Sequence, residues 1–589
     1  MCGIIGYIGE AEAAPMLLNG LKKMEYRGYD SAGIATISNS KISVIKNTGK
    51  ISEINSKIDF LGLRGIIGIA HTRWATHGAI TPENCHPHIS CDSNIAIVHN
   101  GIIDNHRVLR ESLESEGHRF KSDTDSEVIA HLIEKHYNEG VDEKKAVLDT
   151  VNLLCGSFAF VTIFASNPDV MIGARKDAPL MIGLGKHGNF LSSDTVSFID
   201  HTDRVIFIDN FEIVILKGSK IQIFTFAGEK IQKEVTQVAW EAKDTSKEDF
   251  AHFTLKEIYE QPHTLMAALF QDRDRIAEIC SVITKSKYIH ITACGTSYHA
   301  GLLFKGLLGK MAKIRSDITI SSEFSHEVDF VEKDSLVIAL SQSGETADVL
   351  SAVSEAKKSG AKVFSITNVI DSSLNRESDM KLFINCGPEI GVAATKSFTS
   401  QLALIYLLVL SLLGDDLKLA VLQSVAGIIE KTLKSEEKVI SLASKYKDCN
   451  DFYFVGRSLH FPIALEGALK LKELAYNHAE GMAGGELKHG TLALIERGTP
   501  VVVLNPEDGT YYEMLSNASE MKARGAKIIG ISNKPNDVYD EFIQIPMVDD
   551  LFYPLVEVVP LQLLAYHMAV MRQKNPDYPR NLAKSVTVK

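Results

Sequence analysis

Cys2, the second residue of the chain, carries the first side chain that could do covalent chemistry. Removal of Met1, which is common before a small residue, would leave a thiol and a free α-amine on one residue. A thiolate is the reactive form of cysteine, and an α-amine with a pKa of about 7.7–8.0 can accept a proton near neutrality. Cys2 would then supply both nucleophile and base. Taken alone, the residue is more typical of a small apolar position in a buried strand.

Length, charge and cysteine pattern limit the class of protein. At about 100–200 residues per domain, 589 residues predict three or four domains. The net charge of −12 argues against a nucleic-acid or anionic-membrane surface. The most apolar stretch, Leu402–Leu413, is shorter than the about 18 residues of a membrane span and predicts a buried helix. Eight cysteines without a CxxC pair, and no signal pattern at the start, predict a cytoplasmic protein with reduced thiols.

The first 240 residues predict many short strands and few helices. Apolar periodicity predicts helices over Ala13–Tyr26 and Asp125–Tyr137. Without regular strand–helix alternation, we expect stacked sheets with helices on their outer faces. The predicted strands are Gly3–Ile8, Ala32–Ile37, Ile42–Ile45, Ile66–Ala70, Ile95–His99, Phe158–Phe164, Val205–Ile208 and Glu212–Leu216.

Loops rich in arginine, histidine, asparagine and aspartate follow several of these strands, and such loops are usual places for binding and catalytic residues. Singly, each is also explained by turn and capping chemistry; Thr124–Glu127, for example, is a good helix N-terminus. A further loop holds Cys85, His86, His88 and Cys91, which are candidate zinc ligands. The rigid Pro87 and the lack of a second ligand pair at zinc-like spacing favour a polar loop near the active site, with no metal.

Five motifs occur in the order seen in class II glutamine amidotransferases, and the first half of the chain resembles that family. The resemblance implies an α+β N-terminal nucleophile (Ntn) hydrolase sandwich over residues 2–225. In it, Cys2 attacks the side-chain amide of glutamine, and Asn100 and Gly101 form the oxyanion hole. The motifs are Met1–Gly6, Arg27–Gly33, His71–Gly78, His99–Ile103 and Thr124–Glu127.

The same resemblance implies how glutamine is held. Arg73 and Asp125 bind its α-carboxylate and α-ammonium, helped by Thr76 and His77. An arginine and an aspartate match the two charges of a free amino acid. Preorganised donors in an oxyanion hole stabilise an acyl-transfer intermediate by a few kcal/mol, and a glycine allows its backbone to approach the substrate.

Residues 226–275 are expected to connect the two halves, because Glu241–Phe250 is charge-rich and lacks a strand pattern. An amphipathic helix is expected over Pro262–Ile279. Beyond it, strands alternate with helices, which predicts parallel sheets. Gly360–Asn368 recurs as Gly525–Asn533, and other matches at offsets of 159 and 161 residues indicate a tandem duplication. The expected domains cover residues 276–420 and 445–578.

The two copies differ at the loop that would bind phosphate. In the first, the hydroxyls and glycine of Ser341–Thr346 precede a helix and favour a phosphate site, although a plain helix cap has a similar pattern. The second has Asn505–Gly509, whose proline and two acids would repel phosphate. In the second copy, Glu466, Lys470 and Glu473 share one helix face, and His489 lies between glycines. A carboxylate and an imidazole suit an aldose–ketose proton shift, although a solvated salt-bridge stripe has the same spacing.

This half resembles tandem sugar isomerase (SIS) domains, which are α/β folds with parallel sheets of flavodoxin-like or Rossmann-like type. A serine is common in that family where Ala394 stands. The resemblance implies sugar-phosphate contacts by Thr296, Ser297, Ser341, Gln342, Ser343, Thr346, Val392 and Ala583.

The closing run Pro579–Val588 is similar to the end of isomerising glutamine–fructose-6-phosphate aminotransferases, which extends the resemblance to the whole chain. That family implies glutamine hydrolysis, internal ammonia transfer past a gate at Trp74, and conversion of fructose 6-phosphate to glucosamine 6-phosphate, the first step of hexosamine synthesis. It implies that His489 opens the sugar ring and Lys584 forms a Schiff base. Glu473 would move the proton with help from Lys470, under a tail formed by residues 579–589.

The expected partners are glutamine, fructose 6-phosphate and a second copy bound through the SIS domains, without nucleic acid, membrane, metal or organic cofactor. Two alternatives stay open, a non-catalytic phosphosugar sensor and another class II amidotransferase. The second would need a phosphoribosyl-pyrophosphate loop, an ATP-pyrophosphatase loop or flavin and iron–sulfur elements, and none is recognisable. Lys589 replaces an acidic terminal residue associated with the family.

Overall fold

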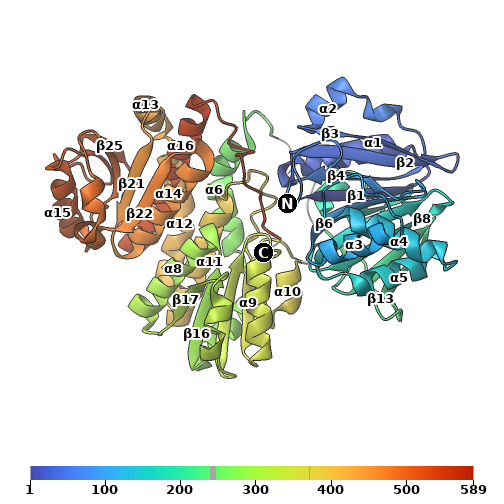
Figure 1. The fold of residues 1–589 in the computed structure, drawn as a ribbon. Coiled ribbons are helices and arrows are strands. Elements are labelled where there is room, and N and C mark those ends of the chain that lie inside the picture. Colours follow the sequence, from blue (N-terminus) through green and yellow to red (C-terminus); the bar gives the residue numbers. More distant parts are fainter. Residues whose placement is uncertain (1, 239–246, 371, 588–589) are drawn as a thin grey trace. The chain divides into compact units, whose positions relative to one another are not determined.

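The computed structural model describes residues 2–238, 247–370 and 372–587 (Figure 1). By their contacts these residues divide into two compact units. The first comprises residues 2–238 with Glu345–Ala347 and residues 583–587. The second comprises residues 247–344 and 348–582, apart from residue 371.

The first unit contains two antiparallel sheets, in the strand orders β15-β11-β9-β10-β1-β4-β2-β3 and β14-β13-β12-β8-β7-β6-β5. The strands are β1 (Gly3–Gly9), β2 (Ser31–Ser38), β3 (Lys41–Thr48), β4 (Ile67–Arg73), β5 (His88–Ile89), β6 (Ile95–Ile103), β7 (Gly156–Phe164), β8 (Asn167–Lys176), β9 (Met181–Leu184), β10 (Gly188–Ser192), β11 (Arg204–Phe207), β12 (Glu212–Lys217), β13 (Lys220–Thr225), β14 (Lys230–Ile231) and β15 (Thr236–Gln237).

Three apolar layers hold this unit together. Alternating strand residues such as Ile4, Val98 and Val161 form the layer between the sheets. One outer layer joins α1 to the first sheet, and the other joins α4 and α5 to the second. The stacked-sheet prediction is therefore confirmed, although β5, β8–β10, β13–β15, α2, α3 and α5 were not predicted. The helices are α1 (Ala13–Met24), α2 (Ile51–Lys57), α3 (His106–Ser115), α4 (Glu127–Asn138) and α5 (Glu143–Leu153).

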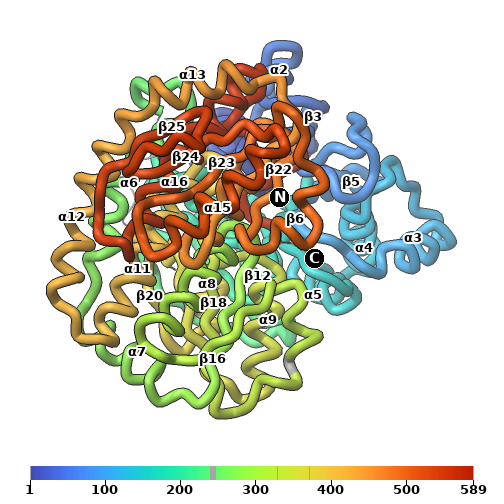
Figure 2. Tube along the Cα trace, turned by 90° about the vertical axis from the view of Figure 1, so that its left-hand side faces the viewer, coloured from blue at the N-terminus to red at the C-terminus, as the bar shows by residue number. Residues whose placement is uncertain are grey.

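The second unit contains two parallel sheets with the same order of strands, β17-β16-β18-β19-β20 and β22-β21-β23-β24-β25. Figure 2 shows the first copy in green to yellow and the second in orange to red. This shared topology confirms the tandem repeat. The strands are β16 (Tyr288–Ala293), β17 (Asp317–Ile320), β18 (Ser335–Ser341), β19 (Lys362–Thr367), β20 (Met380–Phe383), β21 (Asp451–Gly456), β22 (His478–Ala483), β23 (Pro500–Leu504), β24 (Lys527–Ser532) and β25 (Glu541–Gln544).

Helices cover these two sheets. They are α6 (Phe253–Leu269), α7 (Arg273–Lys285), α8 (Gly295–Leu307), α9 (Ala347–Lys358), α10 (Ser373–Glu377), α11 (Lys396–Leu413), α12 (Asp416–Leu433), α13 (Glu436–Tyr446), α14 (Phe461–Ala475), α15 (Tyr511–Lys522) and α16 (Tyr553–Met571). Helices α9, α10 and α15 pack in smaller apolar clusters, and the other helices of this unit share one large apolar core.

The expected helix over Pro262–Ile279 is wrong. The structure has α6 and α7 instead, with Pro262 inside α6. Helix α6 begins earlier because the buried carboxylate of Asp577 accepts hydrogen bonds from the Phe253 and Thr254 N–H groups, at 3.0 and 2.9 Å. Helix α7 begins after Asp272, whose side chain accepts from the Arg275 N–H group as an ordinary N-cap.

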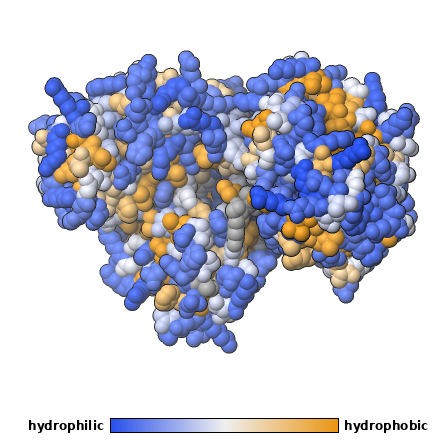
Figure 3. Space-filling model, viewed as in Figure 1, coloured by the Kyte–Doolittle hydropathy of each residue, from blue (hydrophilic) through white to orange (hydrophobic). Residues whose placement is uncertain are grey.

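Among the described residues, two helical segments have the length and hydropathy of a membrane span, Lys396–Leu413 and Asp550–Met571. Of their apolar windows, 78% and 83% respectively are buried inside the protein. The face drawn in Figure 3 is largely hydrophilic, with smaller hydrophobic patches between the hydrophilic regions. Both segments therefore pack as core helices, as predicted for Leu402–Leu413.

Candidate active sites

The thiol of Cys2 lies where strands β1 and β4 meet. Gly3 pairs with Thr72, which brings Cys2 next to the residues that follow β4. The Trp74 N–H group donates to the Cys2 Sγ at 3.2 Å. Burial is the main influence on the thiol and raises its pKa, so formation of the thiolate needs a proton acceptor. The expected acceptor is the α-amine left by loss of Met1, a residue outside those described.

A cleft around Cys2 collects side chains from four motifs. It brings together the residues predicted to hold glutamine, because the ends of β4 and β6 and the start of α4 meet there. It also contains His86 and His99, which were not predicted to bind glutamine. The lining residues are Cys2, Arg73, Trp74, Thr76, His77, His86, His99, Gly101, Thr124, Asp125 and Ser126.

Asn100 and Gly101 lie on β6 beside this cleft. The Asn100 amide donates to the Cys2 carbonyl at 3.1 Å, which points its N–H₂ group toward the nucleophile. Gly101 has φ +126°, and a Cβ atom there would lie 2.0 Å from the Ser157 carbonyl oxygen. This conformation and close packing require glycine, and they place its backbone against the cleft.

The orientation of Asn100 depends on His71, a residue of β4 that the sequence reading did not assign. His71 Nε2 lies 3.1 Å from Asn100 Oδ1. Burial lowers the pKa of His71 to about 3, so the imidazole is neutral at physiological pH. A neutral ring with its proton on Nε2 donates to Oδ1, and this leaves the Asn100 N–H₂ group facing Cys2.

The loop after β4 is held in shape by hydrogen bonds between its backbone and the side chains of Arg73 and Asp30. The Arg73 guanidinium donates to the carbonyl groups of His77, Gly78 and Ala79. The Asp30 carboxylate accepts from the Ala75 N–H group at 2.9 Å, which explains why the motif Arg27–Gly33 accompanies this loop. The result is a fixed cation near Cys2 on a rigid turn.

Asp125 supplies the opposite charge. It is buried, and its Oδ2 accepts from the Ile103 N–H group at 2.8 Å, which ties the start of α4 to the end of β6. The carboxylate and the Arg73 guanidinium line the same cleft. A carboxylate and a guanidinium in one cleft can pair with the α-ammonium and the α-carboxylate of an amino acid, as predicted from the sequence.

The loop that holds Cys85, His86, His88 and Cys91 does not form one group. His86 Nδ1 accepts from the His99 N–H group, and His88 Nε2 lies 3.0 Å from Thr124 Oγ1. Burial lowers the pKa of both imidazoles well below the usual value. Cys91 lies elsewhere, with His118 and His131. Apart from Cys91, the loop is a polar support for the glutamine cleft.

In the second unit, helix α14 carries a buried ionic network. Lys470 Nζ lies 3.4 Å from Glu466 Oε1 and 2.6 Å from Glu473 Oε2. Lys470 and Glu466 are fully buried, whereas Glu473 is partly exposed. Burial alone would lower the pKa of Lys470, but the two carboxylates outweigh it and raise the pKa. Lys470 is therefore a permanent cation beside an accessible carboxylate.

The network continues into the first SIS copy. The Thr296 hydroxyl donates to Glu466 and accepts from Lys470, at 3.1 and 3.2 Å. His299, which the sequence reading missed, lies 2.7 Å from the second oxygen of Glu466. Thr296, at the start of α8, is thus hydrogen-bonded to two residues of α14.

The loop after β18 is a tight turn stabilised by one of its own side chains. The Ser341 hydroxyl accepts from the Gly344 N–H group at 3.0 Å. Gly344 has φ +65°, and a Cβ atom there would lie 2.1 Å from the Ser372 hydroxyl, so only glycine fits. Gln342 and Ser343 lie within the same turn. Ser297, by contrast, already accepts from the Gln401 amide at 3.0 Å.

The loop that contains Val392 is held in shape by acidic side chains that no sequence motif singled out. The Val392 N–H group donates to the Asp577 carbonyl at 3.2 Å. Glu257 accepts from Ile390 and Gly391, and Glu389 accepts from the N–H group of Ser397 at 3.0 Å. Ala394 lies in this loop, and nothing in the structure assigns a consequence to it.

The remaining predicted residues fall in different places. His489 is exposed after β22, as its glycine neighbours suggested. Thr346, Ala583 and Lys584 belong to the first unit, so their contact with sugar stays a prediction. The start of the tail packs on the end of α14, where the Arg580 N–H group donates to the Tyr476 hydroxyl at 2.6 Å. Lys589 lies outside the described residues.

Comparison with known proteins supports both halves of the chain. A glutamine amidotransferase domain matches residues 71–199, and SIS domains match residues 282–411 and 445–572. Over 606 residues that cover 100% of both chains, the sequence is 46% identical to the glutamine–fructose-6-phosphate aminotransferase [isomerizing] of Thermococcus kodakarensis. The relative of the same name from Methanothermobacter thermautotrophicus is 45% identical, again with 100% of both chains covered.

The chain belongs to the glutamine–fructose-6-phosphate aminotransferase family. A solved structure agrees for the second half, the C-terminal domain of glucosamine-fructose-6-phosphate aminotransferase from Francisella tularensis. It is 36% identical with a TM-score of 0.54, and the match covers 56% of this chain and 99% of that one.

In this member of the aminotransferase family, the second SIS copy has a buried ion pair at the loop that corresponds to Ser341–Thr346 of the first copy. Asp508, in the loop after β23, lies 3.1 Å from His460 Nε2, and Glu557 lies 2.8 Å from His460 Nδ1. Burial opposes a charge on this ring, but the two carboxylates dominate and raise its pKa to about 10. His460 is therefore a cation held between two carboxylates in the second copy.

The buried neutral histidines make the glutaminase half of this aminotransferase sensitive to acid. Burial lowers the folded-state pKa of His71 to about 3 and that of His99 to about 4, both below the unfolded value of about 6.5. Between these values only the unfolded chain gains the proton. Each histidine then removes about 1.4 kcal/mol of stability per pH unit as pH falls.

We expect the urea midpoint of the first unit to fall between pH 6.5 and pH 5.0. Tryptophan fluorescence can follow it, because Trp74 and Trp240 both lie in the N-terminal half of the sequence. His71→Gln keeps a donor toward Asn100 but cannot titrate, so the variant should lose stability less steeply with pH, by about 1.4 kcal/mol per unit. Equal pH slopes for the variant and the natural chain would contradict the neutral state of His71.

Proposed function

We propose that this chain converts fructose 6-phosphate and L-glutamine to glucosamine 6-phosphate and L-glutamate. The observation that carries this proposal is the cleft in which Cys2 lies with Arg73, Gly101 and Asp125, in a chain that matches its relatives over the full length. The relatives' name, an isomerising aminotransferase, requires both an amide hydrolase and a ketose–aldose isomerase. The two units supply one candidate site for each.

The first site would hydrolyse glutamine by acyl transfer. The Cys2 thiolate attacks the side-chain amide carbon, and the developing oxyanion is stabilised by the Asn100 amide and the Gly101 N–H group. Collapse of this intermediate breaks the C–N bond, releases ammonia and leaves a thioester. Water then hydrolyses the thioester to glutamate and frees the thiol. Arg73 and Asp125, with Thr76 and His77, hold the amino-acid end so that the amide faces Cys2.

The second site would fix the ammonia. Ser341, Gln342, Ser343 and Thr346 are proposed to bind the sugar phosphate, with Thr296, Ser297, Val392 and Ala583 lining the sugar. His489 would open the ring, and Lys584 would form a Schiff base with the C2 carbonyl before ammonia replaces it. Trp74 would gate the passage of ammonia between the two sites.

Helix α14 gives the proton shift its base. Glu473 is the exposed member of the network and would carry the proton between C1 and C2. Lys470, which the sequence reading made an assistant, keeps its charge because two carboxylates raise its pKa. It can therefore stabilise negative charge on the enol or enolate oxygen, but it cannot act as a base.

We also propose that the enzyme acts in the cytoplasm as a homodimer joined through its SIS domains, without nucleic acid or membrane. Its net charge of −12 argues against a nucleic-acid surface, and the burial of its two most apolar helices argues against a membrane span. Neither site, as proposed, needs a metal or an organic cofactor for its chemistry.

A product assay tests the function. Purified protein with glutamine and fructose 6-phosphate should form glucosamine 6-phosphate and glutamate in equal amounts, measured by mass spectrometry. Either substrate alone should give no amino sugar. A phosphosugar sensor would bind fructose 6-phosphate without any product. Another class II amidotransferase would release glutamate but leave fructose 6-phosphate unaminated, and either result would refute the proposal.

A further inference from the structure

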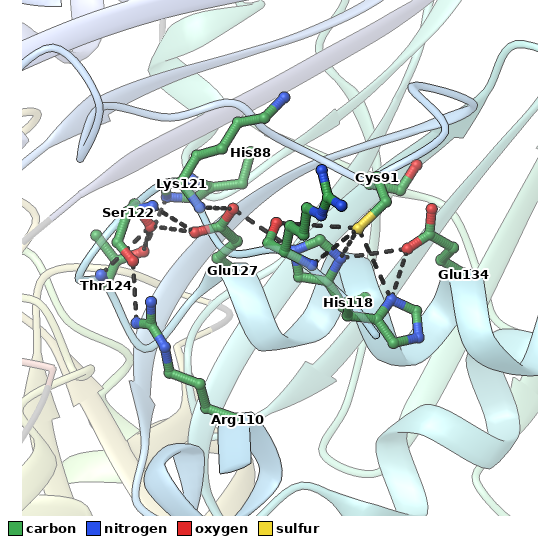
Figure 4. Close-up of polar contacts among 12 residues, drawn as sticks. His88, Cys91, Arg110, His118, Lys121, Ser122, Thr124, Glu127 and Glu134 are labelled. Carbon is green, nitrogen blue, oxygen red and sulfur yellow. Dashed lines mark hydrogen bonds and ion pairs between the residues drawn. The ribbon is translucent and has the colours of Figure 1, made fainter. Parts of the chain in front are cut away.

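Four potential metal ligands converge outside the glutamine cleft (Figure 4). Cys91 follows β5, His118 follows α3, and His131 and Glu134 lie one turn apart on α4. Their ligand atoms all lie within 4.8 Å of one another. His131 and Glu134 are buried, His118 is mostly buried and Cys91 is exposed, so the group lies just beneath the surface. No step of the proposed reaction uses it.

The distances at Cys91 are close to those around a tetrahedral ion, whereas those at Glu134 are hydrogen-bond lengths that would have to lengthen on binding. Ligands about 2.0–2.3 Å from a zinc ion lie about 3.3–3.7 Å apart. The Cys91 Sγ lies 3.6 Å from His131 Nδ1 and 3.9 Å from His118 Nδ1. The same two nitrogens lie 3.2 and 2.8 Å from Glu134 Oε2. Both imidazoles therefore direct Nδ1 toward the thiol and the carboxylate, as ligands of one ion would.

Neighbouring groups hold Cys91, Glu134 and His131 in position. The Arg119 N–H group donates to the Cys91 Sγ at 3.2 Å, and the Asp92 N–H group donates to the other oxygen of Glu134 at 2.9 Å. His131 Nε2 lies 3.5 Å from Glu127 Oε1. A carboxylate behind a histidine in this way is usual at metal sites, where it fixes the ring and raises its basicity.

We propose that Cys91, His118, His131 and Glu134 bind one zinc ion, or another divalent ion of similar preference. A thiolate and a carboxylate neutralise the charge of the ion, and two imidazoles complete the four ligands of a structural site. This differs from the zinc cluster considered from sequence, with which it shares only Cys91. It also replaces the expectation that the chain binds no metal.

The proposed ion would stabilise the loop that carries Asp125. Behind His131, the Glu127 carboxylate accepts from the Lys121 and Ser122 N–H groups, at 2.9 and 2.7 Å. The Ser122 hydroxyl in turn lies 2.9 Å from Thr124 Oγ1, next to Asp125. Figure 4 shows this chain of contacts from Cys91 to Thr124. The proposed role is therefore structural, on the glutamine-binding loop.

Metal analysis of the full-length protein tests the site. After loading with Zn²⁺ and gel filtration, mass spectrometry of the metal should find about one ion per chain. Substitution with Co²⁺ should give a thiolate-to-metal charge-transfer band in the near ultraviolet. Cys91→Ser should lose this band and bind Zn²⁺ about 100-fold more weakly in competition with a chelator.

Cys155→Ser is the matched control, because Cys155 is another exposed free cysteine of the same unit. It should keep both the ion and the band. His118→Gln provides a second ligand variant at a residue that is not fully buried, and it should also weaken binding. Absence of bound Zn²⁺ in the natural chain would overturn the proposal. So would a charge-transfer band that survives in Cys91→Ser, or one that disappears in Cys155→Ser. Because metal content is measured without substrate, failure here is distinct from failure of the proposed function.

Discussion

Cys2→Ala should abolish glutamine-dependent formation of glucosamine 6-phosphate while leaving ketose–aldose isomerisation intact. Without the thiol no thioester forms, and removal of the nucleophile from an acyl-transfer site costs about 10⁴–10⁶-fold in kcat. The proposed base for the isomerisation lies on α14 of the second unit, whereas Cys2 belongs to the first. Glutamate release, amino-sugar formation and conversion of fructose 6-phosphate to glucose 6-phosphate can be measured in parallel.

Cys155→Ala is the control for this variant, because it removes an exposed thiol from the same unit without touching the cleft. It should retain all three rates. Circular dichroism and thermal unfolding establish that both proteins are folded. Loss of isomerisation together with synthesis in a folded Cys2→Ala protein would show that the division of labour between the units is wrong. Substantial glutamate release by the variant would remove Cys2 from the mechanism.

Most of the glutamine cleft was predictable because its residues lie in short motifs at the ends of strands. Cys2 precedes β1, Arg73 ends β4 and Gly101 lies on β6, so an arrangement of stacked sheets brings them to one edge. The positive φ of Gly101 gives a physical reason for its type. The proposed nucleophile and the charged pair could thus be predicted to lie in one cleft.

The supporting residues could not be assigned in the same way. His71 belongs to a recognised motif, but its role depends on how β4 of the first sheet packs against β6 of the second, and on burial that makes the ring neutral. The sequence specifies the residue type, but it does not show that burial lowers the pKa of the imidazole. The same holds for Asp30, which reaches the loop after β4 across 45 positions of the chain. Packing between strands decides both roles.

Long-range capping explains the wrong helix between the halves. Local rules make Pro262 a helix start, because proline lacks an N–H group. The actual start at Phe253 is stabilised by Asp577, 324 positions away. A prediction from neighbouring residues cannot include that carboxylate. The proposed metal ligands show a similar limit, since Cys91 meets His131 only through the packing of α4 on the second sheet.

Glu473→Gln should stop isomerisation and amino-sugar synthesis while glutamine cleavage at Cys2 remains possible. The amide keeps the size of the side chain but cannot accept a proton, and loss of a general base costs about 10²–10⁴-fold in kcat. Lys470 keeps Glu466 as its counterion, so its buried ammonium group still has an anionic partner.

The measurement is the rate of fructose 6-phosphate isomerisation, with thermal unfolding as a check on stability. Glu437→Gln, at an exposed position of α13, is the matched control and should keep the full rate. The sugar phosphate is held elsewhere, so its KM should change only a few-fold, which separates loss of the base from loss of binding. A folded Glu473→Gln enzyme with a rate within a few-fold of the natural one would assign the proton shift to another group. His489, the other proposed acid–base residue of this site, would then be the next candidate.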